Sequence, residues 1–428
     1  MKNPFAGRAL FAGAIALGTL AATLLVINFK GGEKRIERRI ERLYSTEDPQ
    51  FEREASVLLG PPVVSGNRVE VLLNGDRIFP PMLAAISGAR KTINFESYIY
   101  WAGAIGQTFA DALAERARAG VKVHVLLDAV GAAKMDARWM DEMAQAGVQI
   151  RKYHPVSWYN LGRLNNRTHR KLLVVDGLVG FTGGVGIAPE WTGDAQDPDH
   201  WRDTHFRIEG PVVGQLQSVF LDNWVKVSGE VLHGADYFPD IPPAGSQRAQ
   251  MFSSSPSGGS ESMALMYQLA ISSASRTIDL SAAYFVPDEL TIRALIAALR
   301  RGVKVRIIVP GPHIDSETSR SASRALWGEP LAAGASISEY QPTMYHCKVL
   351  IVDGLLTSVG STNFDNRSFR LNDEASLNVF DAAFAAEQTR IFENDLRSAR
   401  AMTLAEWTNR PVREKAGDWL ASLIGSQL

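Results

Sequence analysis

An internal duplication constrains this chain of 428 residues more than any other feature of its sequence. The segment 112–125 (ALAERARAGVKVHV) recurs as 294–307 (ALIAALRRGVKVRI), and 89–94 (ARKTIN) recurs as 274–279 (ASRTID). Each copy predicts a strand, an amphipathic helix, a glycine turn and a strand rich in β-branched residues. We therefore expect an α/β protein of two pseudo-symmetric repeats, each a mostly parallel sheet flanked by helices.

A second repeated pattern carries the candidate chemistry, because both units contain the spacing His-x-Lys-x4-Asp. The residues are His169, Lys171 and Asp176 in the first unit, and His346, Lys348 and Asp353 in the second. A single match carries little weight in a chain with 8 histidines, whereas two matches at corresponding places are a specific signal. Residues two apart on a strand face the same side, so each His and Lys are predicted to project together. The aspartates fall on the opposite face, which predicts an orienting or structural contribution to the site.

Two imidazoles and two ammonium groups in one cleft suit displacement at a phosphodiester. One neutral histidine can attack phosphorus and form a covalent phospho-histidine. The other can donate a proton to the leaving alkoxide and later accept one from the incoming hydroxyl, since the ordinary pKa of histidine lies near neutrality. The two lysines would offset charge on the non-bridging oxygens. Because the sequence offers no convincing group of metal ligands, we expect no metal and no other cofactor.

Further residues near each motif are candidates for binding the phosphate. Ser361 and Asn363 follow the second motif and can donate neutral hydrogen bonds to phosphate oxygens. The first unit has Gly184 and Gly186 at the corresponding places. Its contribution is therefore expected to come from a backbone N–H, with Gly184 as the candidate.

Each histidine also needs a hydrogen-bond partner that fixes its tautomer. Asp203, downstream of the first motif, and Glu374, downstream of the second, are the candidates. Four aromatic residues could line an entrance for acyl chains, although packing is an equally good account of each. They are Trp158, Tyr159, Trp191 and Tyr284.

The N-terminus differs from the duplicated body. Residues 9–29 form an uncharged apolar run of 21 residues, close to the ~20 residues that a helix needs to cross a bilayer. We expect an uncleaved transmembrane helix followed by a charged stalk helix, with a signal peptide as the alternative. Basic residues gather after the run, which favours a cytoplasmic body under the positive-inside rule. The predicted parts are 1–56 for anchor and stalk, 57–245 for the first repeat and 246–428 for the second.

Composition limits the partners. Lys and Arg total 45 against 46 Asp and Glu, a formal charge of -1. A dedicated nucleic-acid binder usually has a basic excess, so no nucleic-acid partner is expected, although a local basic cleft remains compatible with this balance. Cys347 is the one cysteine, which excludes an internal disulfide. A non-catalytic membrane scaffold is disfavoured because binding alone would not require His and Lys in both motifs. The oligomeric state is left open.

The motifs resemble those of the phospholipase D superfamily, in which H-x-K-x4-D is followed by G-S-x-N. The resemblance extends over roughly residues 57–410 and is closer still to bacterial cardiolipin synthases. The segments that carry it are 69–101, 201–210, 283–288 and 340–374. It implies one active site between the halves, a phospho-histidine intermediate and no metal. In such enzymes the first-motif histidine is usually the nucleophile, which makes His169 the nucleophile and His346 the acid/base.

This resemblance implies transfer of a phosphatidyl group from one phosphatidylglycerol to the hydroxyl of another, with release of glycerol. The expected location is the bacterial inner membrane, with a single membrane span. Hydrolytic phospholipase D activity and a membrane-anchored nuclease are the alternatives, because the superfamily includes both. The family usually has Asn where this chain has Gly186, which leaves substrate handling open.

Overall fold

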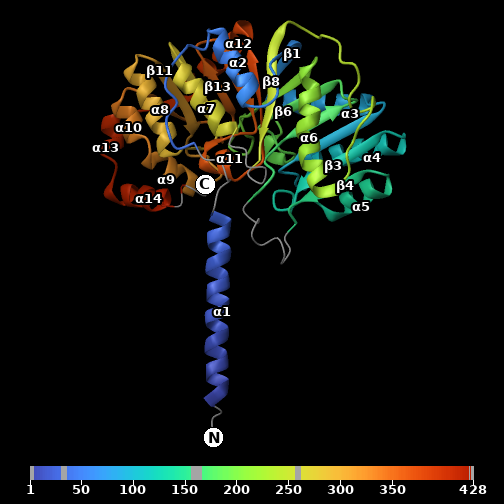
Figure 1. Cartoon of the computed structure of the whole chain (residues 1–428), viewed down its shortest axis with the longest axis horizontal. Coiled ribbons are helices and arrows are strands. Elements are labelled where there is room, and N and C mark those ends of the chain that lie inside the picture. The colour runs from blue at the N-terminus through green and yellow to red at the C-terminus, as the bar shows by residue number, and fades with distance from the viewer. Residues whose placement is uncertain (1–3, 30–35, 156–165, 256–261, 424, 426–428) are drawn as a thin grey trace.

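The computed structural model describes residues 4–29, 36–155, 166–255, 262–423 and 425, and within the first of these ranges the side chains of residues 11–23. Trp158 and Tyr159 lie outside the described residues. The body consists of two halves side by side, and helix α1 (Pro4–Phe29) projects from it as a separate rod (Figure 1).

One sheet of 15 strands runs through both halves. The first repeat contributes β1 (Val64–Leu73), β2 (Thr92–Ser97), β3 (Lys122–Asp128), β4 (Gln149–Tyr153), β5 (Leu172–Val175), β6 (Val179–Gly183) and β7 (Thr204–Glu209). The second contributes β8 (Gln247–Ser254), β9 (Thr277–Ala282), β11 (Lys304–Pro310), β12 (Ser336–Tyr340), β13 (Lys348–Val352), β14 (Leu356–Gly360), β16 (Glu374–Phe380) and β17 (Ala399–Met402). The strand order is β17-β12-β11-β9-β13-β14-β16-β8-β1-β7-β6-β5-β2-β3-β4. Outward from the central β1–β8 pair, each strand of the first repeat has a counterpart at the same place in the second, and β17 is an additional edge strand. This order confirms the two repeats.

The sheet is mixed, so the prediction of mostly parallel repeats is wrong. Strands β2, β3 and β4 are parallel, as are β9, β11 and β12. The motif strands β5 and β13 instead pair antiparallel with both neighbours. The reason is a tight hairpin after each motif. Asp176 and Gly177 have φ of 54° and 66°, and Asp353 and Gly354 have 55° and 66°, the left-handed pair that an Asp-Gly type I′ turn requires.

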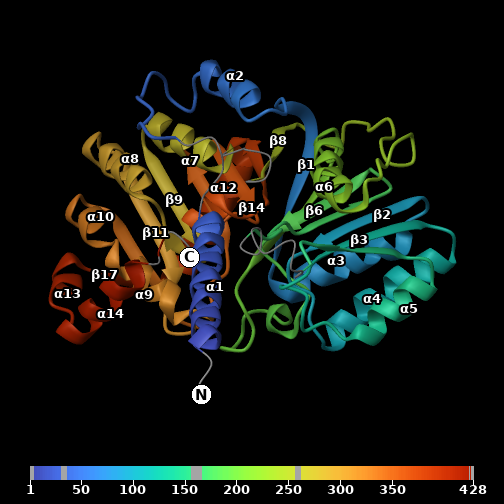
Figure 2. The same ribbon diagram turned by 60° about the horizontal axis from the view of Figure 1, so that its bottom comes forward.

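Helices cover both faces of the sheet (Figure 2). The first repeat contains α3 (Asn74–Gly88), α4 (Ala104–Arg118), α5 (Ala137–Gln145), the 3₁₀ helix η2 (Pro189–Trp191) and α6 (Val212–Ser228). The second contains α7 (Ser262–Ser273), α8 (Glu289–Arg300), α9 (Glu317–Ala325), α10 (Gly328–Ala332), α11 (Asn366–Arg370), α12 (Ala382–Arg397), α13 (Leu404–Thr408) and α14 (Val412–Ser422). Two short strands, β10 (Phe285–Val286) and β15 (Phe364–Asp365), pair separately in parallel.

A hydrophobic core shared by the two repeats fixes their relative position. Side chains of α6 and α12 pack into one buried cluster together with residues of the central strands. Phe206 of the first repeat contacts Phe384 of the second, with ring centroids 6.2 Å apart. Because apolar burial is the main stabilising contribution to such a core, the motif strands of the two repeats are held in one rigid body.

The N-terminal segment departs from the predicted stalk. Residues 36–43, expected in a charged helix, are irregular, and the helix α2 (Pro49–Leu58) begins later. Ile40 and Tyr44 pack against the core of the second repeat, and Thr46 donates a hydrogen bond to Asp353 at 2.7 Å. These contacts hold the segment along the body, so tertiary packing outweighs its helical pattern.

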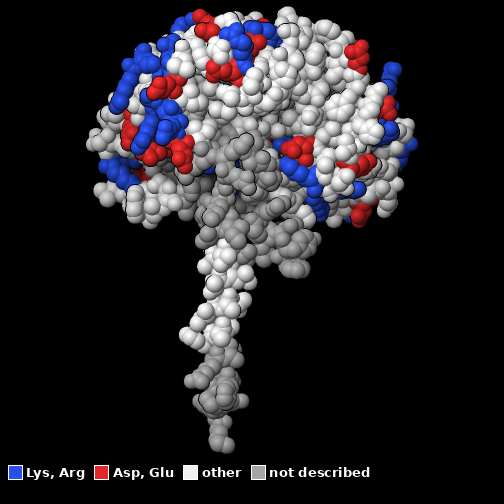
Figure 3. All heavy atoms as spheres, in the orientation of Figure 1, with Lys and Arg blue, Asp and Glu red and all other residues white. Residues whose placement is uncertain are grey.

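The described surface of α1 carries no Lys, Arg, Asp or Glu side chain (Figure 3). Phe11 is 70% exposed and Leu17 is 69% exposed. Over the fully described part of the chain, no helix combines the length and the hydropathy needed to cross a membrane.

Candidate active site

The two motifs meet in one cavity at the junction of the repeats. His169 and His346 both line this space of about 410 Å³, together with Asn363 of the second repeat. Each histidine precedes its motif strand, β5 or β13, so the two strand beginnings face the same cavity. His169 is 8% exposed and His346 is 5% exposed. The cavity is thus built from both repeats, as the sequence predicted.

Each histidine is paired with a carboxylate of the other repeat. His169 Nδ1 lies 3.0 Å from Glu374 Oε1, and His346 Nδ1 lies 2.7 Å from Asp203 Oδ2. The backbone sets this crossed arrangement. The His169 N–H donates to the carbonyl of Asp373 at 2.9 Å, and the His346 N–H donates to the carbonyl of Arg202 at 2.8 Å. Each histidine segment therefore runs beside the segment that carries its carboxylate.

The carboxylates fix the tautomer of both rings. Glu374 and Asp203 are fully buried. Burial alone would raise the pKa of Glu374, but His169 holds that pKa below its usual value. His346 lowers the pKa of Asp203 in the same way against the effect of burial. An ionised carboxylate accepts only, so each Nδ1 carries the proton and each Nε2 keeps its lone pair.

Burial makes both histidines weak bases. It lowers the pKa of His169 to about 4, despite the opposing effect of Glu374. Burial and then the neighbouring Lys348 lower the pKa of His346 to about 3. Both rings are therefore neutral near pH 7, the state that a nucleophilic imidazole requires.

The two lysines occupy matching positions. Lys171 Nζ donates to the carbonyl of His169 at 2.8 Å, and Lys348 Nζ donates to the carbonyl of His346 at 2.7 Å. Lys348 Nζ also lies 3.1 Å from Nε2 of His346. Burial lowers the pKa of Lys171 to about 7 and also lowers that of Lys348. An anion in the cavity would favour the charged form of both lysines, which suits a phosphate site.

Ser361 and Gly184 were candidates for binding the phosphate, but in the structure both make hydrogen bonds to other groups of the protein. The Ser361 hydroxyl donates to Glu374 Oε2 at 2.5 Å, so in this structure it orients the carboxylate. The Gly184 N–H donates to the carbonyl of Thr204 at 3.1 Å and is not directed at the cavity. A Cβ at Gly184 would lie 2.3 Å from Asp203 Oδ1, which explains the glycine. Asn363 is the predicted phosphate ligand that does line the cavity.

The first repeat uses aromatic side chains where the second uses polar ones. Trp191 Nε1 donates to Asp203 Oδ2 at 2.9 Å. In the second repeat, the corresponding hydrogen bond to Glu374 comes from Ser361. A Cβ at Gly186 would lie 2.9 Å from Ile99 Cβ and 3.2 Å from Trp191 Cζ3, so those side chains fill the space of the asparagine usual in the family. The ring centroid of Trp191 lies 5.3 Å from that of His346, and Trp201 lies at 5.4 Å. Trp191 therefore packs within the site, and Tyr284 also lines the cavity.

Asp176 and Asp353 lie at the opposite ends of the motif strands from the histidines. Asp176 accepts backbone N–H groups of residues 90–92 at 2.7–3.2 Å. Asp353 accepts those of residues 275–277 at 2.6–3.1 Å. Each aspartate thus ties its hairpin to the start of a neighbouring strand, which is the structural alternative that the sequence allowed.

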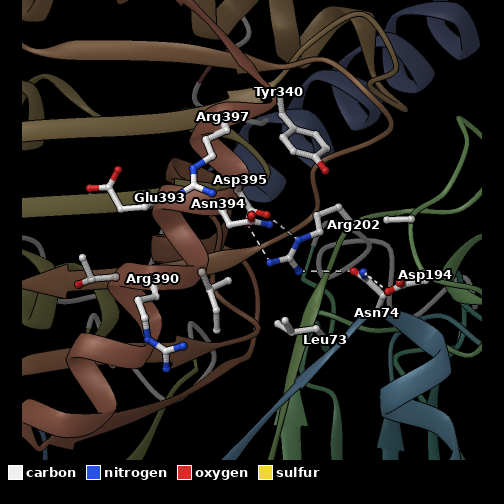
Figure 4. Close-up of a pocket in the computed structure, with 13 residues that line it drawn as sticks. Leu73, Asn74, Asp194, Arg202, Tyr340, Arg390, Glu393, Asn394, Asp395 and Arg397 are labelled. Carbon is white, nitrogen blue, oxygen red and sulfur yellow. Dashed lines mark hydrogen bonds and ion pairs between the residues drawn. The ribbon is translucent and has the colours of Figure 1, made fainter.

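A buried ion pair behind the site supports Asp203, and sequence reasoning missed it. Arg202 donates to the two oxygens of Asp395 at 3.0 and 2.9 Å and to the carbonyl of Asp203 at 2.7 Å. Asn74 Oδ1 accepts from the Asp203 N–H at 3.3 Å. Arg202, Asp395 and Asn74 line a second cavity of about 820 Å³, in which Tyr340 and α12 face the first repeat (Figure 4). Arg202 and Asp395 lie 193 residues apart, so no local pattern could have revealed the pair.

Two repeats that each bring a histidine to one shared cavity, with a lysine bonded beside each histidine, define a phospholipase D-like enzyme. Among the residues that the structure describes, no group of His, Cys, Asp or Glu side chains could hold a metal ion. The family model described as "Cardiolipin synthase, PLD-like domain" matches residues 82–221 and 267–396.

Known proteins agree with that match. Cardiolipin synthase A of Pseudomonas putida (strain GB-1) is 35% identical over 364 residues, which cover 85% of this chain and 75% of the relative. A probable cardiolipin synthase of Bacillus subtilis (strain 168) is 36% identical over 366 residues, 85% of this chain and 72% of the relative. The solved phosphatidylserine synthase of Haemophilus influenzae shares the fold, with a TM-score of 0.67 at 14% identity over 89% of this chain and 100% of that one. The chain belongs to the cardiolipin synthase family of the phospholipase D superfamily and is a phosphatidyltransferase of that type.

Proposed function

We propose that the enzyme joins two phosphatidylglycerols into cardiolipin and releases glycerol. The observation that carries the proposal is the pair of buried histidines that line one cavity, each with Nδ1 held by a carboxylate of the opposite repeat. Such a site can hold a nucleophile and a proton carrier on opposite sides of one phosphate. The similarity to cardiolipin synthases of Pseudomonas putida and Bacillus subtilis supports a cardiolipin product.

In the first half of the proposed reaction, Nε2 of His169 attacks phosphorus. The new P–N bond forms as the P–O bond to the leaving glycerol breaks, and His346 donates a proton to that oxygen. Burial lowers the pKa of His346 to about 3, so proton donation requires that this pKa rise when substrate binds. The negative phosphodiester provides this change, because a nearby anion favours the protonated ring.

In the second half, His346 takes the proton from a hydroxyl of the acceptor lipid. The acceptor oxygen bonds to phosphorus, the P–N bond breaks, and His169 returns to its neutral form. Lys171 and Lys348 offset charge on the non-bridging oxygens in both halves. Asn363 adds a neutral hydrogen bond from the wall of the cavity.

Analysis of lipid products tests this function. The purified full-length protein in detergent is incubated with phosphatidylglycerol, and the products are followed by mass spectrometry beside His169→Ala and His346→Ala variants. Cardiolipin and glycerol that appear only with the unaltered protein support the proposal. Phosphatidic acid without cardiolipin would make water the acceptor and the enzyme a hydrolytic phospholipase D. If neither lipid forms but single-stranded DNA is cut, the lipid assignment is wrong.

We further propose that the segment containing α1 anchors the enzyme in a bacterial inner membrane, with the body on the cytoplasmic side. Support comes from the apolar side chains of α1, which are exposed rather than packed on the body, and from the basic residues after the run. The test is sedimentation of the full chain with membranes after an alkaline wash. A full chain released to the supernatant by that wash would contradict the anchor.

A further inference from the structure

One carboxylate in the active-site cavity has no part in the proposed chemistry. Asp315 lines the cavity with His169 and His346, although the substrate phosphate is itself an anion. The other acidic side chains at the site are engaged elsewhere. Asp203 and Glu374 hold the histidines, and Asp365 caps α11 by accepting the Ser368 N–H at 2.7 Å. A carboxylate that faces the cavity repels phosphate, so Asp315 is suited to contact a different, uncharged part of a substrate.

Tyr284 places Asp315 on the His346 side of the cavity. The Tyr284 hydroxyl donates to both oxygens of Asp315, at 2.7 and 2.6 Å. The Tyr284 ring meets the His346 ring edge to face, with centroids 6.5 Å apart. His346 is the proposed base for the acceptor hydroxyl, so groups adjacent to that hydroxyl come closest to Tyr284 and Asp315.

The chemistry of this pair suits a diol. A carboxylate accepts strong hydrogen bonds from hydroxyl groups, and the Tyr284 oxygen can accept another while its proton is given to Asp315. The glycerol headgroup of a phosphatidylglycerol has two vicinal hydroxyls. One must give its proton to His346 as its oxygen bonds to phosphorus and the P–N bond breaks. The other remains free to donate a hydrogen bond.

We propose that Asp315 and Tyr284 form an acceptor subsite that binds the second, non-reacting hydroxyl of a vicinal diol. The inference rests on the proposed transferase function and deepens it, because it assigns the preference for a glycerol headgroup over simple alcohols to two residues. Hydrogen bonds to charged groups in a buried site discriminate by about tenfold or more when the partner is absent.

Competition between two matched alcohols in one tube tests the subsite. Phosphatidylglycerol in detergent is the donor, and 1,2-propanediol and 1-propanol are present at equal concentration. Mass spectrometry gives the ratio of phosphatidylpropanediol to phosphatidylpropanol. The unaltered enzyme is expected to favour the diol by about tenfold or more, and Asp315→Asn is expected to bring the ratio close to one. Tyr284→Phe should lower the ratio in the same direction.

Glu317→Gln is the matched control, because it removes the same charge two residues away. The Glu317 side chain is 70% exposed and does not line the cavity, so this variant should keep the wild-type ratio. The ratio compares two products of the same active molecules, so partial loss of folded enzyme does not alter it. If Asp315→Asn is inactive, Tyr284→Phe provides the measurement.

The outcomes separate the two proposals. An enzyme that transfers phosphatidyl groups but keeps its diol preference in Asp315→Asn and Tyr284→Phe overturns the subsite and leaves the transferase function intact. A drop in the ratio in Glu317→Gln as large as that in Asp315→Asn also overturns it, since the effect would then be one of general charge. An unaltered enzyme that forms neither cardiolipin nor either alcohol product contradicts both proposals.

Discussion

Glu374 reaches His169 across the boundary between the repeats, with Oε1 3.0 Å from Nδ1 of the ring. The reciprocal pair, Asp203 and His346, crosses the same boundary in the other direction. In each histidine, Nδ1 is therefore held by a carboxylate of the other repeat. The active site exists only when the two repeats are packed together, and this gives the shared core a direct part in function.

Glu374→Gln should lower kcat by roughly 10- to 100-fold while leaving the fold intact, since the amide no longer enforces the reactive tautomer of His169. The hydroxyl of Ser361 can still donate to the new side chain, so little stability should be lost. Rates of cardiolipin formation and thermal melting in detergent measure the two effects. A variant with unchanged kcat would show that the crossed carboxylate does not orient the nucleophile.

Gly184→Ala should reduce activity strongly, because the added Cβ would lie 2.3 Å from the Asp203 carboxylate and displace it from His346. Gly214→Ala is the control. Gly214 lies inside α6, its Cβ would meet Ile241 at an ordinary 3.6 Å, and alanine favours helix by about 1 kcal/mol. Rates of cardiolipin formation by the two variants test whether the added Cβ at Gly184 disturbs the site. Equal activity of Gly184→Ala and the unaltered enzyme would contradict the steric argument.

Asp395→Ala should destabilise the body by roughly 3–5 kcal/mol, because it leaves the buried guanidinium of Arg202 without its counter-charge. The double variant Arg202→Met, Asp395→Leu should recover much of this loss, since no unpaired charge remains. Denaturant unfolding in detergent gives both values. The pairing account fails if the double variant is less stable than Asp395→Ala.

Stability should fall as the pH is lowered from about 6.5 to about 4. The pKa of His169 is about 4 and that of His124 is also about 4, mainly because burial disfavours the charged ring, whereas an unfolded histidine titrates near 6.5. Between these pH values the unfolded chain binds more protons than the folded one. Each such histidine therefore lowers the free energy of unfolding by about 1.4 kcal/mol for each unit that the pH falls.

Melting temperatures across this pH range measure the effect. His124→Phe removes one of these groups outside the active-site cavity and should reduce the slope without reversing it. A protein equally stable at pH 7 and pH 4.5 would show that these rings are not held neutral.

Much of the site could be predicted from sequence because its signals are local. Spacing along a strand determines that His169 and Lys171 share a face, and the duplication supplies the second pair at His346 and Lys348. The Asp-Gly pairs after the motifs are a local signal too, because Asp-Gly is typical of a type I′ turn, which makes the flanking strands antiparallel.

Tertiary structure decided which partners meet. The crossing of Glu374 to His169 depends on packing between repeats, as does the pair of Arg202 with Asp395. The irregular path of residues 36–43 likewise follows from contacts with the second repeat. The duplication and the reactive side chains could be predicted from the sequence alone, because strand periodicity and motif spacing are properties of neighbouring residues. Whether each histidine pairs with a carboxylate of its own repeat or of the other repeat depends on the tertiary structure. The pairs cross between the repeats because the two repeats bury one common core.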